Sequence, residues 1–301
     1  MSGLRLVPPT LSKGRPAAPK RAQRSGTREH FARLARPAVR TLAVASGKGG
    51  VGKSTVAANL AVALGQLGAR VVLFDGDLAQ ANLDLLLGVS SRWDLGHVLR
   101  GEKRLEQIVI EGPAGVRLVP AASGDCDLAD LDDFRREGLY RELSRLALDA
   151  DLVLIDTASG ASRLTSQFAR AATELVIVTT PEPTSYSDAY GLIKVLVAQG
   201  LGVTPSVLVN RAASVEEAEE VAHDLGSLTR RFLRLNVDSL GAIPDDPAVG
   251  QAIRRREPVV CAFPKSPSAL AFRTLAQRLW ARPQDPTSSA WPERAGDRLS
   301  A

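Results

Sequence analysis

The residues with the clearest chemistry in this chain lie in the stretch SGKGGVGKST, residues 46–55. Its spacing fits G-x-x-x-x-G-K-[ST], in which glycines turn backbone N–H groups toward phosphate oxygens and a following helix adds its N-terminal partial positive charge. We expect Lys53 to reach the β- and γ-phosphates of a nucleotide and the Ser54 hydroxyl to bind Mg²⁺. The stretch also raises a question, because this scheme assigns no task to the second lysine, Lys48.

Three aspartates are placed to complete such a site. Asp75 and Asp77 stand at the end of the apolar run RVVLFD, and Asp156 ends the run DLVLID. An isolated aspartate at the end of a strand is usually a turn or a helix cap. Three of them after a phosphate loop favour a different role, since Mg²⁺ prefers oxygen ligands and an attacking water must be oriented.

These residues need a scaffold, and short apolar runs alternate with helical patterns after residue 40. The predicted strands are TLAVAS, RVVLFD, VRLVP, DLVLID, ELVIVTT, PSVLVN and VDSLGAI; the predicted helices span 53–67, 132–149, 184–199, 215–233 and 268–281. Runs this rich in Val, Ile and Leu are typical of strands buried on both faces. The sequence therefore predicts an α/β fold, a doubly wound, mostly parallel sheet with helices on both faces, whose ligands bind at the carboxyl ends of the strands.

Composition divides the chain into three parts. Residues 1–40 combine Pro, Arg and small residues, which indicates a disordered basic arm; residues 41–282 form the predicted domain, and residues 283–301 a polar tail. The arm lacks the apolar run of a secretion signal, and no segment has 18 consecutive apolar residues. With only two cysteines, Cys126 and Cys261, we expect a cytoplasmic protein without a zinc or iron–sulfur site.

The net charge of +5 lies mostly at the front of the chain. Residues 1–40 hold ten basic residues and one acid, so the remaining 261 residues sum to −4. Aromatic residues make up only 4% of the chain, too few for an obvious base-stacking platform. A mildly acidic body argues against a folded basic surface that grips nucleic acid, and we expect no specific nucleic-acid partner.

Several stretches resemble a known family. KGGVGKST resembles the deviant Walker A box of the MinD/ParA family of dimerising P-loop ATPases, and DGDLAQANLDLLLG resembles its switch I. VRLVPAASG, LIDTASG and VTTPEPTSYSDAYGLIKVL resemble the narrower FlhG/FleN/YlxH family, whose members regulate flagellar number and placement. The resemblance implies an ATP hydrolase with ATP and Mg²⁺ as cofactors, slow and stimulated by partners, that switches between a monomer and an ATP-bound homodimer.

The resemblance also implies roles for single residues. Lys48 would cross the dimer interface to the nucleotide of the other subunit, much as an arginine finger does. Asp77 would position the hydrolytic water beside Lys53, while Asp75, Asp156 and Ser54 would surround Mg²⁺. The implied nucleotide-binding residues are Gly49, Gly50, Val51, Gly52, Lys53, Ser54 and Thr55, with Asn210, Pro244 and Asp245 around adenine. For Asn210 a second interpretation stays open, that of a turn residue at the end of a strand.

Two switch positions depart from the family pattern. Ala79 and Ala158 stand where FlhG proteins tend to have glycine, although Gly160 is kept. We therefore expect a stiffer switch II and slower hydrolysis. The N-terminal arm also lacks a clear match to the glutamine-containing motif with which some FlhG proteins stimulate the GTPase FlhF. Three kinds of partner stay open: FlhF, the flagellar switch-complex proteins and a flagellar transcriptional regulator. The candidate helix REHFARLAR is the segment we would test for stimulation of FlhF.

A membrane contact is the next question, because MinD and many FlhG proteins bind membranes through a C-terminal amphipathic helix. Phe272, Leu275, Ala276, Leu279 and Trp280 recur at helical spacing, a pattern that serves a protein core or a membrane surface equally well. We favour core packing, since this segment resembles the last core helix of the family. The basic arm would then give only a weak, peripheral attraction to the inner face of the membrane.

Other functions give different expectations. A chromosome- or plasmid-partitioning ATPase of the ParA type would bind DNA nonspecifically, and that binding would survive removal of the arm. A metallocluster carrier would need bridging cysteines, and a tyrosine-kinase relative would need a C-terminal tyrosine cluster; the sequence offers neither. A nucleotide-binding adaptor would bind ATP without hydrolysing it.

Overall fold

A computed structural model describes residues 39–77, 80–121 and 133–282. The predicted arm up to residue 38, Ala79, Cys126 and the tail 283–301 lie outside these residues. The described residues all belong to one compact unit that begins at Pro37. No helix among them is long and apolar enough to cross a bilayer.

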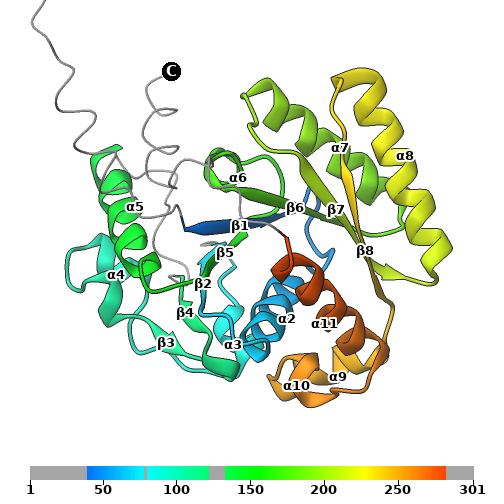
Figure 1. Ribbon diagram of the computed structural model, residues 1–301. Helices are drawn as coiled ribbons and strands as arrows, with labels where there is room; N and C mark the ends of the chain where they lie inside the picture. The colour runs from blue at the N-terminus through cyan, green and yellow to red at the C-terminus, as the bar shows by residue number, and fades with distance from the viewer. Residues whose placement is uncertain (1–38, 78–79, 122–132, 283–301) are drawn as a thin grey trace, which may run out of the picture. The chain divides into compact units, whose positions relative to one another are not determined.

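In this part of the chain the strands form a single sheet in the order β3-β4-β2-β5-β1-β6-β7-β8 (Figure 1). The strands are β1 (Arg40–Ala45), β2 (Val71–Gly76), β3 (Ile110–Glu111), β4 (Arg117–Val119), β5 (Leu152–Thr157), β6 (Glu174–Thr179), β7 (Pro205–Ala212) and β8 (Asp238–Pro244). All neighbours run parallel except β3, which is antiparallel to β4. The predicted doubly wound, mostly parallel sheet is confirmed.

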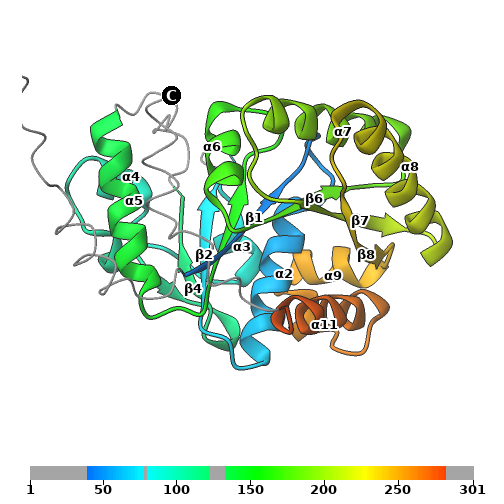
Figure 2. The same cartoon turned by 45° about the horizontal axis from the view of Figure 1, so that its top comes forward.

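Helices cover both faces of the sheet (Figure 2). They are α2 (Lys53–Gln66), α3 (Leu83–Leu87), α4 (Leu95–Leu99), α5 (Asp133–Ala147), α6 (Arg163–Ala171), α7 (Pro183–Ala198), α8 (Val215–Leu233), α9 (Pro247–Arg255), α10 (Val259–Ala262) and α11 (Pro267–Trp280), with 3₁₀ turns η1 (Leu105–Gln107) and η2 (Pro113–Gly115). One face carries α2, α3, α10 and α11, and the other carries α5 to α8. The central strands are therefore buried on both sides, which explains their apolar composition.

The last helix, α11, packs into the core as predicted. Phe272, Leu275, Ala276 and Leu279 are buried against α2 and β8, while Trp280 keeps 37% of its surface exposed. The buried Arg40 at the start of β1 fixes the end of this helix, since its guanidinium donates to the Leu279 carbonyl at 2.6 Å. The apolar stripe of α11 thus packs against the rest of the domain.

The arrangement of strands brings the predicted site residues to one edge. β1 lies in the middle of the sheet and leads directly into the glycine-rich stretch, with β5 and then β2 on one side and β6 on the other. Because these strands are parallel, their carboxyl ends meet at the same edge, where open α/β sheets bind ligands. The loops that follow the four strands therefore surround the start of α2.

Candidate active site

The glycine-rich loop favours glycine at Gly52 because of its backbone conformation and requires it at Gly47 because there is no room for a side chain. Gly52 caps α2 with φ of 87°, a left-handed value that L side chains rarely adopt, and its carbonyl accepts from the Val56 N–H at 2.8 Å. A Cβ atom added to Gly47 would lie 2.1 Å from the carbonyl carbon of Asp188 in α7. The loop is therefore pressed against α7 while its amides lead into the N-terminus of α2, the geometry of an anion site.

Lys53 is buried at the centre of this site. Its side chain is 6% exposed, and its Nζ donates to Oδ1 of Asp156 at 2.7 Å, with Oδ2 of Asp77 at 4.0 Å. The Ser54 hydroxyl lies 3.5 Å from the same Nζ. The structure thus brings together the lysine, the hydroxyl and two of the three carboxylates that the sequence predicted for the site.

The third carboxylate, Asp75, lies beside Asp156 on the neighbouring strand, and both are almost completely buried. Burial, reinforced by the negative charge of Asp156, raises the pKa of Asp75 to about 7, although the N–H groups of Leu83, Asp77 and Asn82 donate to it. Burial also raises the pKa of Asp156, and the ammonium of Lys53 opposes that shift. Of these two buried neighbouring acids, only Asp156 has a lysine as an ion-pair partner, and this excess of negative charge favours an additional cation.

The residues present fit a magnesium ion bound together with a nucleotide. Oδ2 of Asp156 is buried and has no hydrogen-bond partner in the described part of the chain, so it is a free acceptor for a water or a cation. No group of three His, Cys, Asp or Glu side chains among the described residues is placed to hold a metal alone. The site therefore suits Mg²⁺, which is usually held by few carboxylates together with water and substrate phosphates.

Lys48 takes a different position from Lys53. Its Nζ donates to Oε2 of Glu182 at 3.1 Å and to Oγ1 of Thr184 at 3.0 Å, beside the first turn of α7, and 38% of its side chain is exposed. Sequence reasoning missed both contact residues. They lie in the stretch VTTPEPTS, which was noticed only for its family resemblance, and only the fold brings that stretch to the phosphate loop.

The loop after β5, which follows Asp156, is tied to the phosphate loop. The Gly160 N–H donates to the Ser46 carbonyl at 2.8 Å, and Gly160 has φ of 77°, a left-handed value that favours glycine. On its other side, the Ala158 carbonyl accepts from the Thr165 hydroxyl at 3.0 Å. The two loops are therefore in direct contact through the backbone.

Asn210 lies inside β7, which continues to Ala212, so its interpretation as a strand-end turn residue is wrong. Its amide nitrogen donates to the Val51 carbonyl at 2.7 Å and blocks any side chain at Gly52, where a Cβ atom would approach it to 2.4 Å. Asn210 thus supports the phosphate loop itself. The contact between Asn210 and the phosphate loop could have been predicted only with knowledge of the strand order, because the two segments lie far apart in the chain.

The other predicted nucleotide contacts are more peripheral. Pro244 ends β8, and the N–H of the exposed Asp245 donates to the Ala212 carbonyl at 2.9 Å, which joins the ends of β7 and β8. In the phosphate loop, Gly49 and Gly50 are exposed, while Thr55 is half-buried in the first turn of α2. The predicted adenine contact at Asn210, Pro244 and Asp245 stays a prediction.

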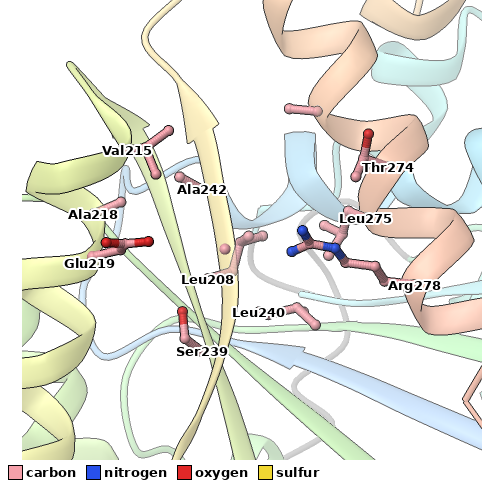
Figure 3. A pocket seen from close by; sticks show the side chains of 12 residues that line it. Leu208, Val215, Ala218, Glu219, Ser239, Leu240, Ala242, Thr274, Leu275 and Arg278 are labelled. Carbon is pink, nitrogen blue, oxygen red and sulfur yellow. The ribbon is translucent and has the colours of Figure 1, made fainter.

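A separate cavity of about 340 Å³ lies between α8 and α11 over β8 (Figure 3). Leu208, Leu240 and Leu275 line it, with Glu219 on one side and Arg278 on the other. It contains none of the predicted site residues. The candidate active site is therefore identified by the chemistry of its loop and carboxylates.

Comparisons with known proteins agree with this geometry. The family model "CobQ/CobB/MinD/ParA nucleotide binding domain" matches residues 42–259. The antiactivator FleN of Pseudomonas aeruginosa is 41% identical over 251 residues, covering 82% of this chain and 89% of that protein. The flagellum site-determining protein YlxH of Helicobacter pylori is 32% identical over 217 residues, covering 72% of this chain and 73% of that protein.

A solved structure extends the comparison to the fold. The septum site-determining protein MinD of Pyrococcus horikoshii, complexed with Mg-ADP, superposes with a TM-score of 0.66 at 32% identity and covers 80% of this chain and 96% of its own. The phosphate loop, the buried lysine and the paired carboxylates agree with these sequence and structure comparisons. The chain belongs to the MinD/ParA family of nucleotide-binding proteins and, within it, to the FlhG/FleN/YlxH group.

Proposed function

We propose that this protein is a MinD-like ATPase that hydrolyses ATP to ADP and phosphate and controls the number or placement of flagella. The observation that carries the proposal is the buried set of Lys53, Asp156 and Asp77 under a glycine-rich loop at a helix N-terminus. The complex of a MinD relative with Mg-ADP and the similarity to FleN and YlxH support it.

Each residue of the set has a task in hydrolysis. Lys53 exchanges its carboxylate partner for the β- and γ-phosphate oxygens, and the loop amides from Gly49 to Gly52 hold those phosphates. Ser54, Asp75 and Asp156 would hold Mg²⁺, which neutralises the charge that develops on the phosphates. Asp77 has 14% of its side chain exposed, so it can meet solvent and orient the attacking water. Because the loop after β5 is hydrogen-bonded to Ser46, we expect the basal turnover of ATP to be slow and to be stimulated by a partner.

Lys48 then serves an ATP-bound homodimer. Its contacts with Glu182 and Thr184 are half-exposed, and surface ion pairs of this kind contribute at most about 1 kcal/mol. Lys48 can therefore leave them at small cost and reach the nucleotide of a second subunit. The γ-phosphate favours the dimer only through contacts that exist in the closed state, and this contact in trans is one of them.

The biological output would depend on partners. A flagellar transcriptional regulator, the GTPase FlhF and flagellar switch-complex proteins are the candidates, and we place the protein in the cytoplasm with a weak peripheral membrane contact. A ParA-type partitioning function is less favoured, because YlxH is named a flagellum site-determining protein and FleN an antiactivator. DNA binding that weakens steeply with salt and survives removal of residues 1–40 would favour the partitioning function instead.

The test compares the purified wild-type chain with Lys48→Ala and Asp77→Ala. We expect light scattering to show monomers with ADP and dimers with ATP, and we expect Lys48→Ala to stay monomeric with both nucleotides. Asp77→Ala should bind ATP and dimerise but release no phosphate. If the wild-type chain binds ATP and neither dimerises nor releases phosphate, the protein is a nucleotide-binding adaptor and the ATPase proposal fails.

A further inference from the structure

The charge of the folded domain is distributed very unevenly. Residues 247–282 contain seven Lys or Arg and a single acid, Glu257, whereas residues 41–246 contain 19 basic and 28 acidic residues. The net charge of −4 outside the first 40 residues therefore hides a strongly basic region. That region coincides with the three consecutive helices α9, α10 and α11.

The fold gathers part of this charge on one surface. The helices α9, α10 and α11 lie together (Figure 1). The guanidinium of Arg255 lies 4.7 Å from the ring centre of Phe263, and Arg273 donates to the Pro264 carbonyl at 2.8 Å. The end of α9 thus meets the connection between α10 and α11. We call this region the α9–α11 surface, defined by the residues Ile253, Arg254, Arg255, Arg256, Lys265 and Leu270.

The four cations of the α9–α11 surface are available to a partner. Arg254, Arg255, Arg256 and Lys265 are all exposed, and within the described ranges none of them forms an ion pair with an acid. By contrast, Arg70 and Arg100 elsewhere on the domain are engaged by carboxylates. The α9–α11 surface therefore presents uncompensated positive charge.

Two large apolar side chains on the same helices are also exposed. Leu270 is 52% exposed and Ile253 is 43% exposed. A single exposed leucine is ordinary, but exposed aliphatic groups on the same helices as cations without an acidic partner match the two layers of an anionic bilayer, phosphate headgroups above acyl chains. Nucleic acid would use the cations and leave the aliphatic groups without a role, since bases stack on aromatic rings.

We propose that the α9–α11 surface is a docking surface for bilayers that contain anionic lipid. The proposal rests on the membrane contact of the proposed function and gives it a location in the folded domain. It uses the outward side chains at the α9–α11 junction, whereas the apolar stripe of α11 remains buried in the core.

The test measures binding of the full-length chain to vesicles of phosphatidylcholine with increasing phosphatidylglycerol. The variant Arg254→Ala/Arg255→Ala is compared with Arg230→Ala/Arg231→Ala, which removes the same charge from the last turn of α8. The pairs are matched, because both lie at a helix end and each contains an arginine over a phenylalanine ring. Each basic residue near an anionic surface contributes about fivefold in affinity, so the first variant should bind about 25-fold more weakly and the second almost normally.

A second pair tests the apolar part. Leu270→Ser should weaken vesicle binding, while Leu148→Ser, at a leucine that is 49% exposed on another part of the domain, should not. Equal vesicle binding by the two arginine variants would overturn the proposal and leave the N-terminal arm as the membrane contact. The proposal also fails if Arg254→Ala/Arg255→Ala loses affinity for double-stranded DNA and keeps its affinity for vesicles.

The result of the vesicle experiment can be interpreted separately from the proposed ATPase activity. Neither arginine pair belongs to the candidate active site, so both variants should release phosphate from ATP at the wild-type rate. If neither the wild type nor any variant releases phosphate, the proposed ATPase activity is refuted. The vesicle measurements would still show whether the α9–α11 surface binds anionic lipid.

Discussion

The two lysines of the phosphate loop should differ sharply in their contribution to the stability of the nucleotide-free protein. Lys53 is buried, with its ammonium 2.7 Å from the carboxylate of the buried Asp156 and 4.0 Å from that of Asp77, whereas Lys48 is half-exposed beside Glu182. Lys53→Met removes the charge and leaves the buried Asp156, which lies beside the buried Asp75, without its cationic partner. Lys48→Met makes the same chemical change in the same loop and serves as the control.

The magnitude follows from burial. Removing one partner of a buried ion pair costs about 3–5 kcal/mol of unfolding free energy, while an exposed pair contributes about 0–1 kcal/mol. The cost of Lys53→Met should depend on pH. The pKa of Asp75 in the folded protein is about 7, above the unfolded value, so its contribution is fully present below the unfolded pKa and is lost as pH rises through about 7. The pKa of Asp156 is also raised, and loss of Lys53 raises it further.

Urea unfolding of the wild type and both variants at pH 5 and pH 8, without nucleotide, would measure these differences. We expect Lys53→Met to be much less stable than Lys48→Met at pH 8, and most of the gap to close at pH 5 as the carboxylates bind protons. A gap of less than about 1 kcal/mol at pH 8 would refute the buried-pair reasoning, as would a gap that grows on acidification.

Three further outcomes can be measured. Gly47→Ala should lower the free energy of unfolding, measured in urea, by about 3 kcal/mol, because the added Cβ would overlap the backbone of α7. Gly50→Ala should lower it by only about 1 kcal/mol, because that position has open space but a φ of 79°. Equal losses in the two variants would contradict this steric argument. Glu174→Gln should cost about 2 kcal/mol, since Glu174 holds both Arg40 and Arg282 but remains 21% exposed, and unchanged unfolding would show that the cluster is not stabilising. Mg²⁺ with ATP at about 100 times its dissociation constant should add about 2.7 kcal/mol to the unfolding free energy, and chelation with EDTA should remove most of it; a gain that survives EDTA would argue against the metal.

Much of the fold could be predicted from the sequence. The strands β1, β2, β5 and β6 are almost wholly apolar, and a buried strand in a parallel sheet has little alternative to that composition. The short elements were missed. Strand β3 has two residues and α10 has four, too few to show a period, and they form because longer neighbours pack around them.

The sequence by itself also determined the chemistry of the loop, because the spacing from Gly47 to Ser54 is a local property and local geometry fixes which groups meet a phosphate. Only the tertiary structure decided the contacts between segments far apart in the chain. Lys53 meets Asp156 across 103 positions, and Lys48 meets Glu182 across 134. The same holds for the α9–α11 surface, whose charge disappears in a chain-wide average. Burial and proximity depend on the order of the strands, and that order cannot be read from local periodicity.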